Sequence, residues 1–218
     1  MEIIVKDLSK KFKKVTVLEN INVKFESGKI YGIVGRNGSG KSVFLKILCS
    51  FYKPTTGEVL YDNVNYNSNN SFPPSVRALI EKPTFFPDLT GYENLKLLAS
   101  IQNKIGDTEI NKTLELVNLT TEKDKKYSEY SLGTKQKLAI AQVLMESPDV
   151  MIFDELFNGI EESTVEKIRN ILLELKSQNK LIIVTSHIKE DIDVLSDEVY
   201  KFDNDALGRI KWKTILNW

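Results

Sequence analysis

The sequence predicts an α/β fold: a mostly parallel sheet with an N-terminal antiparallel β layer and an inserted helical subdomain. Three observations lead to this prediction. Residues 2–6 and 15–25 alternate in hydropathy, as half-buried antiparallel strands do. Short apolar runs then alternate with helical patterns, which is the order of a parallel sheet. Between these runs, residues 90–146 have a mainly helical pattern.

The composition is that of an ordinary soluble globular protein. Of 218 residues, 41% are hydrophobic and 28% charged, which excludes disordered and fibrous classes. Thirty Lys and Arg balance thirty Asp and Glu, so the chain has no basic excess. We therefore expect no general nucleic-acid binding. The apolar runs are much shorter than the roughly 20 residues of a membrane-spanning helix, and the N-terminus lacks a secretory-signal pattern. We expect a cytoplasmic chain without a membrane span, in which the single cysteine, Cys49, is buried.

The first buried strand is expected at residues 30–34. It leads directly into a glycine-rich loop, and an apolar-periodic helix follows at residues 43–51. Another strand is expected at residues 57–61, before an Asn- and Ser-rich loop at residues 62–71. This order places the glycine-rich loop between a buried strand and a helix.

The helical subdomain carries two one-sided apolar stripes. Asp107 is expected to cap the first helix and Ser131 the second. We therefore predict a single domain whose α/β core comprises residues 1–89 and 147–218. Residues 90–146 are predicted to form the inserted helical signature subdomain.

After the insertion, the α/β order returns. A strand is expected at Val150–Phe153, and Ser163 with Glu166 predicts a capping box at the start of the next helix. A strand at Leu181–Thr185 follows. The C-terminal residues 206–218 are expected to pack on the domain, with a dimer contact as the alternative.

The glycine-rich loop satisfies the phosphate-binding pattern G-x-x-x-x-G-K-[ST] in full. Its glycines let backbone N–H groups point at phosphate oxygens, and the helix that follows adds its positive dipole end. Lys41 is predicted to reach the β- and γ-phosphates of ATP, and the Ser42 hydroxyl to ligate Mg²⁺. The motif predicts a P-loop NTPase core, and its strand–helix context disfavours a chance glycine-rich turn. The predicted nucleotide-binding residues of the loop are Gly35, Arg36, Asn37, Gly38, Ser39, Gly40, Lys41, Ser42 and Val43.

Two acids end the apolar strand Val150–Phe153. Asp154 is suited to hold Mg²⁺ through its water shell, and Glu155 to act as general base on the attacking water. An acid pair at a strand end is otherwise a helix cap or a solvated turn. Its combination with the phosphate loop favours the catalytic interpretation.

Over residues 3–202 the sequence resembles the ATP-binding-cassette (ABC) ATPases. Besides the loop and the acid pair, Ser131 and Gly133 match the family's signature segment, usually written LSGGQ. The segment departs from that pattern because Leu132 and Thr134 replace the first glycine and the glutamine. The resemblance implies that Ser131 and Gly133 contact the γ-phosphate held by a second protomer, and an ordinary N-capped helix is the alternative.

Four further positions correspond to family motifs. His187, the only histidine, stands at the switch position, which implies contact with the γ-phosphate and the attacking water. Phe12 matches the adenine-stacking aromatic residue, with a core phenylalanine as the alternative. Glu81 replaces the family's glutamine, and its carboxylate would ligate Mg²⁺ unless it is a solvated loop acid. Glu161 replaces the aspartate of the aspartate loop.

The resemblance implies the ATP-hydrolysing subunit of an ABC transporter. The predicted catalytic residues are Glu155, His187 and Lys41, and the predicted metal ligands are Ser42, Asp154 and Glu81. Residues 87–95 are similar to a segment of bacterial drug and peptide exporter cassettes, so export is favoured over uptake. Two chains, identical or paralogous, would close on ATP and Mg²⁺ and drive separately encoded transmembrane permease subunits. The permease would dock on residues 81–95 and the helical subdomain and hold the chain at the inner face of the cell membrane.

Two other functions stay open at this point. A soluble ABC ATPase could act on the ribosome, DNA or cofactor assembly. The single cassette and the lack of a sustained heptad pattern disfavour it. A small-molecule kinase would share the phosphate loop but not the ordered signature, acid pair and switch histidine.

Overall fold

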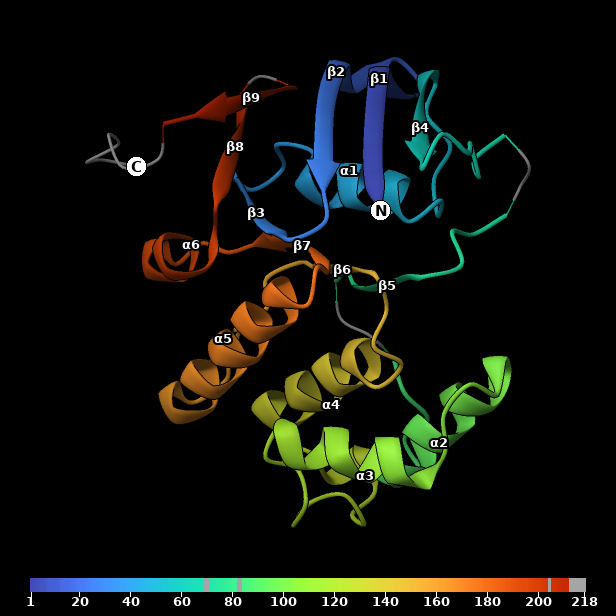
Figure 1. Cartoon of the computed structure of the whole chain (residues 1–218), viewed down its shortest axis with the longest axis vertical. Coiled ribbons are helices and arrows are strands. Elements are labelled where there is room, and N and C mark those ends of the chain that lie inside the picture. Colours follow the sequence, from blue (N-terminus) through green and yellow to red (C-terminus); the bar gives the residue numbers. More distant parts are fainter. Residues whose placement is uncertain (69–70, 82–83, 204, 212–218) are drawn as a thin grey trace.

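The computed structural model describes residues 1–68, 71–81, 84–203 and 205–211. In these residues the strands are β1 (Glu2–Phe12), β2 (Val15–Glu26), β3 (Lys29–Val34), β4 (Thr56–Tyr61), β5 (Val76–Leu79), β6 (Val150–Phe153), β7 (Leu181–Thr185), β8 (Glu198–Asp203) and β9 (Ala206–Ile210). The helices are α1 (Lys41–Leu48), α2 (Gly91–Gln102), α3 (Asp107–Leu116), α4 (Leu132–Leu144), α5 (Glu162–Ser177) and α6 (Lys189–Leu195), with a short 3₁₀ turn at Tyr127–Glu129. Figure 1 shows the antiparallel strands at the top, the second sheet across the middle and α2, α3 and α4 below.

The N-terminal layer is a three-stranded antiparallel sheet of order β2-β1-β4. Strand β1 pairs antiparallel with both neighbours, with Ile3 opposite Phe25 and Tyr61. These three side chains are buried together with apolar residues of α1 such as Phe44 and Leu45. The predicted antiparallel layer is confirmed, although β1 runs on to Phe12.

The second sheet has the order β5-β6-β7-β3-β8-β9. The strands β5, β6, β7, β3 and β8 pair in parallel, and β9 pairs antiparallel with β8 at the edge. Every residue of β6 and β7 is buried, because helices cover both faces of a parallel sheet. The predicted α/β fold with a mostly parallel sheet is confirmed.

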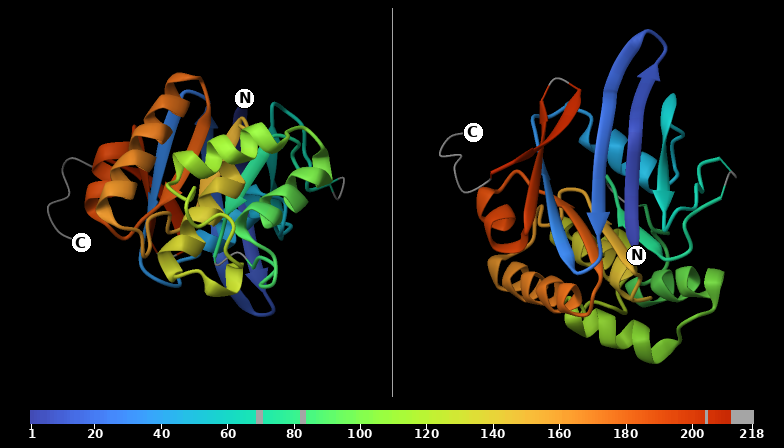
Figure 2. Two further views of the ribbon diagram at one scale, coloured as in Figure 1. Left: turned by 90° about the horizontal axis from the view of Figure 1, so that it is seen from below. Right: turned by 45° about the horizontal axis from the view of Figure 1, so that its top comes forward.

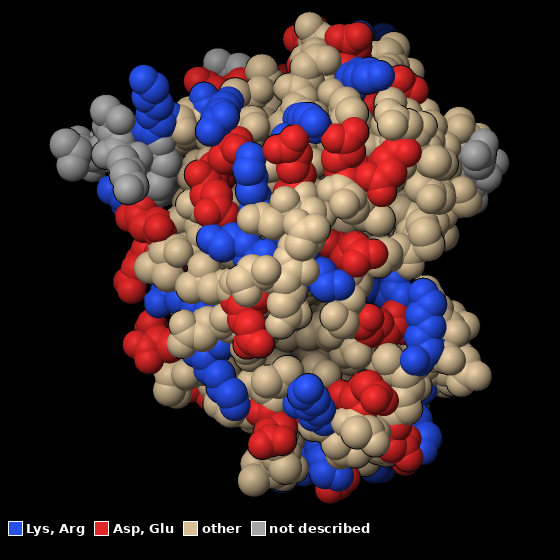
Figure 3. Space-filling model, viewed as in Figure 1, with Lys and Arg blue, Asp and Glu red and all other residues tan. Residues whose placement is uncertain are grey.

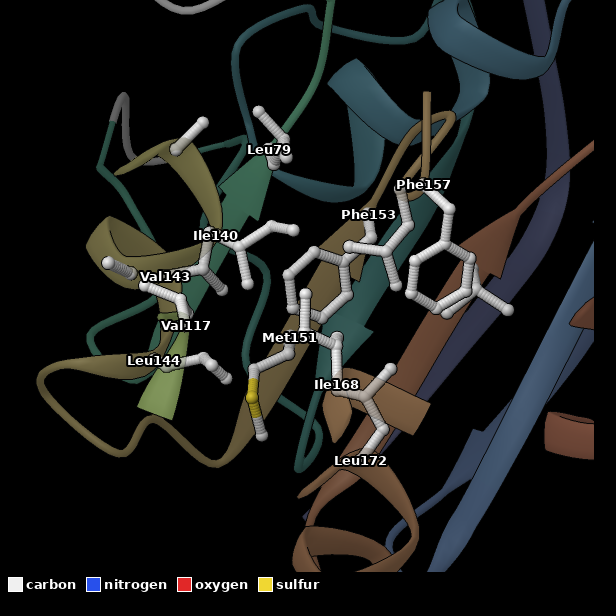
Figure 4. Packing of buried hydrophobic residues seen from close by; sticks show 14 of the residues in the cluster. Leu79, Val117, Ile140, Val143, Leu144, Met151, Phe153, Phe157, Ile168 and Leu172 are labelled. Atoms are coloured by element: carbon white, nitrogen blue, oxygen red, sulfur yellow. The ribbon is translucent and has the colours of Figure 1, made fainter. Parts of the chain in front are cut away.

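Apolar residues on alternate sides of the sheet form two cores. One face of β6 and β7 packs toward α1, and the other face packs toward α4 and α5. In Figure 4, Met151 and Phe153 of β6 lie between Leu144 of α4 and the pair Ile168 and Leu172 of α5. In the right view of Figure 2, α1 and α5 lie on opposite sides of this sheet. The helical group is therefore joined to the sheet by a continuous hydrophobic core.

Two predicted helix caps are wrong, and one is confirmed. Helix α3 begins at Asp107, and Gly106 occupies its N-cap position. Helix α5 begins at Glu162 after Glu161, so no capping box of Ser163 and Glu166 forms. The Ser131 cap of α4 is confirmed, because its hydroxyl accepts the Thr134 N–H at 3.2 Å.

Near the C-terminus, β8 and β9 form a hairpin that the sequence patterns did not predict. The first part of residues 206–218 packs on the domain as β9. The aromatic and apolar residues beyond it, Trp212, Ile215, Leu216 and Trp218, lie outside the described residues. Among the described residues, no helix combines the length and apolarity needed to cross a membrane.

Candidate functional site

The predicted site residues gather where three neighbouring parallel strands end. Strand β7 lies between β6 and β3. The glycine-rich loop follows β3, the acid pair follows β6, and His187 follows β7. Ligands of open α/β sheets bind at the carboxyl ends of strands. The topology therefore brings together three segments that are far apart in the sequence.

The loop after β3 turns into α1 through a left-handed glycine. Gly40 has φ 95°, and a Cβ there would approach Leu18 Cδ2 to 2.7 Å and the Val17 carbonyl oxygen to 3.0 Å. A side chain would therefore be excluded both by the backbone conformation and by space. Helix α1 begins at Lys41, so its first N–H groups face the loop. This arrangement is suited to bind an anion.

Lys41 lies inside the loop, with 8% of its surface exposed. Its ammonium group donates to the carbonyl oxygens of Gly35 at 2.7 Å and Arg36 at 3.1 Å. Burial lowers the pKa of Lys41, and the nearby carboxylates of Glu155 and Asp154 oppose this shift. The amine is thus placed to bind phosphate oxygens when the loop holds a nucleotide.

Two observations indicate that the loop and Asp154 are suited to a nucleotide with Mg²⁺. The Ser39 hydroxyl is buried in the loop without a hydrogen-bond partner among the described residues, so it offers an unused polar group to a phosphate. Asp154 Oδ2 accepts from Ser42 Oγ at 2.7 Å, and Asp154 Oδ1 accepts from Thr185 Oγ1 at 2.6 Å. A hydroxyl and a carboxylate are oxygen ligands of the kind that Mg²⁺ prefers. Ser42 and Asp154 together fit such an ion.

Glu155 and His187 contact each other beside the loop. Glu155 Oε1 lies 2.8 Å from His187 Nε2. Burial raises the pKa of Glu155, the histidine opposes this shift, and the neighbouring Asp154 adds to it. The Glu155 backbone has φ 54°, and its N–H donates to Thr185 Oγ1 at 2.9 Å. A carboxylate of raised pKa next to a phosphate loop is suited to act as a general base.

A cavity of about 430 Å³ lies between these segments. Its lining consists of Val17, Asn37, Gly38, Ser39, Gly40, Lys41, Ser42, Val43, Asp154, Glu155, Asn158 and His187. Two of these, Val17 and Asn158, are absent from the sequence-based prediction. Asn158 hydrogen-bonds the Glu155 side chain. Its place just after the acid pair was an available signal, whereas nothing in the sequence marks Val17.

The signature residues do not line this cavity. Ser131 caps α4 and is exposed together with Leu132, whose side chain is 62% exposed. A Cβ at Gly133 would come within 2.4 Å of the Gly159 carbonyl oxygen. The N-terminus of α4 is therefore pressed against the loop that follows the acid pair.

Four further predicted residues also lie outside the cavity lining, namely Gly35 and Arg36 at the start of the loop, Phe12 and Glu81. Phe12 is 40% exposed and packs edge-on against Tyr52, with ring centroids 5.7 Å apart and Lys10 Nζ 4.9 Å from the Phe12 ring. Glu81 is mostly exposed and forms an ion pair with Lys46 of α1 at 2.6 Å. The structure does not bring the side chain of Phe12 or Glu81 to the cavity.

Glu161 connects the signature helix to α5. Lys137 of α4 donates to its carboxylate, and Thr164 Oγ1 does so at 2.8 Å. The Lys137 ammonium lowers the pKa of Glu161 to about 2. Gln136 of α4 also donates to the backbone oxygen of Leu156 at 2.9 Å. The segment after the acid pair is therefore attached to α4 by side chains of two consecutive residues.

Charged side chains are mixed on the visible surface. Figure 3 shows Lys and Arg interspersed with Asp and Glu over one face of the molecule. Many of them form exposed pairs, such as Lys24 with Glu2 and Glu26. This arrangement agrees with a net charge of zero.

Comparisons with known proteins identify the family of the chain. The profile of the family described as ABC transporter matches residues 18–158. An uncharacterized ABC transporter ATP-binding protein, YybJ of Bacillus subtilis, is 40% identical over 92% of both chains. The bacitracin transport ATP-binding protein BcrA of Enterococcus faecalis is 38% identical, and the match covers 88% of this chain and 63% of that protein. The dimeric structure of MJ0796, a bacterial ABC transporter cassette, is 25% identical with a TM-score of 0.85 and covers 95% of this chain and 97% of that chain.

Proposed function

The chain belongs to the ABC transporter family as its ATP-binding, ATP-hydrolysing subunit, and from this premise we propose that it drives an exporter through a separately encoded membrane permease. One observation carries the proposal: the phosphate loop, the acid pair and His187 surround one cavity at the ends of three adjacent strands. The relative named for bacitracin transport supports export of a peptide or drug. The names of the relatives disfavour a ribosome, DNA or cofactor-assembly role.

In the proposed reaction, the loop N–H groups and Lys41 bind the phosphates of ATP. Glu155 accepts a proton from water as its oxygen attacks the γ-phosphorus, and the bond to the bridging oxygen of ADP breaks. His187 holds the Glu155 carboxylate and contacts the γ-phosphate. Mg²⁺ bound near Ser42 and Asp154 would neutralise charge on the β- and γ-phosphates.

The signature residues complete the site from a second chain in this proposal. Ser131 and Gly133 lie at an exposed helix N-terminus, where a partner's γ-phosphate can approach. The dimeric cassette among the structural relatives supports this arrangement. ATP would then lie between two protomers, and its hydrolysis would let them separate.

The proposed permease contact lies on two apolar hollows beside the helical group. One is lined by Phe51, Phe72 and Arg77. The exposed Phe51 and Phe72 rings pack edge-on, with their centroids 5.9 Å apart. The other is lined by Phe86 and Leu97, both exposed, within the predicted docking segment and α2. A cytoplasmic segment of the permease with apolar side chains would cover these residues and hold the chain at the inner face of the membrane.

Affinity purification of the tagged chain from native membranes in mild detergent tests this function. A stoichiometric polytopic membrane protein should co-elute with the wild type and with Lys41→Ala, and should be lost with Phe51→Asp or Phe72→Asp. Recovery alone, or with ribosomes or nucleic acid, would contradict the exporter and favour the soluble alternative.

A further inference from the structure

A buried polar cluster lies behind the turn that carries His187. Asp191 of α6 is 1% exposed, and its carboxylate accepts from Arg169 Nη2 of α5 at 2.6 Å and from Ser186 Oγ at 2.7 Å. The Ser186 hydroxyl in turn accepts the N–H of Ile188 at 3.0 Å. One carboxylate is thus connected to the residues on both sides of His187.

The charges of this cluster are taken out of water at a cost. Arg169 is 8% exposed, and its other acidic partners, Glu162 and Glu190, are exposed and farther away, at 3.3 and 3.5 Å. A buried ion pair is weak evidence for stability, because apolar residues of similar volume often stabilise a fold as well. Its geometry, in contrast, is specific: a planar guanidinium orients a carboxylate. A role in orientation accounts for this pair better than a role in stability.

His187 depends on its backbone for its position. Its side chain is 46% exposed, so surrounding packing covers only part of the ring. The ring reaches Glu155 through Nε2 at 2.8 Å. A shift of the turn from Ser186 to Ile188 would therefore move the ring away from Glu155.

We propose that Asp191, oriented by Arg169, is a positioning residue that fixes the Ser186–Ile188 turn and thereby places His187 against Glu155. The proposal rests on the proposed ATPase function, because it assigns the residues that position one of its catalytic groups. Asp191 and Arg169 are not among the residues that line the cavity, and they act through the turn.

The first test is the rate of ATP hydrolysis by Asp191→Asn. The amide is nearly isosteric, but it loses the charge that holds Arg169 and replaces one acceptor with a donor. Because small misplacements of a catalytic group cost up to about a hundredfold, we expect kcat to fall between about ten- and a hundredfold while KM for ATP is retained. Glu190→Gln, one residue earlier on α6, removes an exposed partner of the same arginine and should leave both constants unchanged.

A double-mutant cycle separates positioning from a merely structural effect. If Asp191 acts through His187, then Asp191→Asn should change kcat by less than about twofold in a His187→Ala background. Equal fold losses in both backgrounds would overturn the proposal. An unchanged kcat in His187→Ala alone would contradict the role of His187 in the proposed function and, with it, the catalytic part of this proposal.

Amide exchange of Ile188 in the nucleotide-free protein tests the turn without any hydrolysis. Asp191→Asn and Arg169→Lys should exchange this amide faster than the wild type, and Glu190→Gln should not. Unchanged protection in both variants would overturn the positioning role while leaving the ATPase function intact. Arg169→Lys keeps the charge but loses the planar guanidinium that orients Asp191, so it keeps the measurement decisive if Asp191→Asn does not fold.

Discussion

The phosphate loop with its acid pair and the signature segment differ in how they satisfy their polar groups. In the first region, Lys41 donates to the Gly35 carbonyl oxygen and Ser42 donates to Asp154. Lys41 and Asp154 are buried, and Ser42 is partly buried. In the second region, Ser131 satisfies its own helix, and Leu132 is exposed. The first is a formed pocket, whereas the second is a surface that faces outward. In the arrangement we propose, a complete ATP site therefore needs the pocket of one chain and the signature surface of a second chain.

The departures from the family's motifs follow the same division. The loop and acid pair match in full, whereas Leu132, Thr134, Glu161 and Glu81 depart from the motifs outside the pocket. Glu161 forms an ion pair with Lys137, and Glu81 forms one with Lys46. Two of these four departures, Glu161 and Glu81, are therefore accommodated by ion pairs within the chain.

The largest effect is expected from Lys41→Ala, which removes the cation of the formed pocket. Loss of one preorganised charged donor costs on the order of a hundred- to a thousandfold, so kcat/KM for ATP should fall at least about a hundredfold. Steady-state hydrolysis measures this, with the exposed Lys14→Ala as control. A loss smaller than tenfold would show that the loop does not hold the phosphates.

Gly133→Ala should damage the outward surface and spare the pocket. Its Cβ would lie 2.4 Å from the Gly159 carbonyl oxygen, so the loop must move. Overpacking of this kind costs about 1–3 kcal/mol of stability. ATP-dependent dimerisation should be lost while ATP binding to the monomer persists, as equilibrium dialysis and sedimentation would show. Gly208→Ala, where a Cβ meets nothing within 4 Å, is the control, and intact dimerisation of Gly133→Ala would contradict the account.

Ser131→Ala tests the same signature surface with a smaller loss of stability. Loss of an N-cap hydroxyl costs about 1 kcal/mol, which for a domain of this size lowers Tm by about 2–4 °C. Thr90→Ala removes the corresponding cap of α2 and should lower Tm similarly. Only Ser131→Ala should also weaken ATP-dependent dimerisation, and equal dimerisation of the two variants would refute a contact of Ser131 with the partner's nucleotide.

Glu81→Gln is expected to have the smallest effect. Its ion pair with Lys46 is exposed on the glutamate side, and such pairs contribute about 0–1 kcal/mol. Thermal unfolding should therefore change little. An amide oxygen can still ligate Mg²⁺, so the Mg²⁺ concentration for half-maximal hydrolysis should be retained. A large rise in that concentration would show that the carboxylate charge itself binds the ion.

Most of the pocket could be predicted because the phosphate loop and the acid pair each have a local pattern, whereas Val17 has none. The loop residues from Gly35 to Ser42 are contiguous, and Asp154 and Glu155 directly follow an apolar strand. The order of strands and helices then implies that these segments meet. The parallel sheet and the antiparallel layer followed from hydropathy in the same way.

Features that depend on partners distant in the sequence could not be predicted. The start of α5 is set by Glu161, which Lys137 of α4 binds, and this contact has no local signal. Glu81 pairs with Lys46, which is also distant in the sequence, and lies outside the cavity lining. This contact has no local signal either. The Arg169–Asp191 pair connects two helices whose charged residues resemble solvated surface charges in the sequence. The predicted domain boundaries and the roles of the site residues stay predictions.

The most direct test of the account is the oligomeric state of Glu155→Gln with ATP and Mg²⁺. Without its general base the chain should bind ATP and not hydrolyse it, so two chains should stay closed around the nucleotide. Analytical ultracentrifugation should show a dimer at millimolar ATP, and a monomer without ATP or when Lys41→Ala is added. A variant that binds ATP and remains monomeric at millimolar ATP would contradict the claim that the outward signature surface completes the site of a second chain.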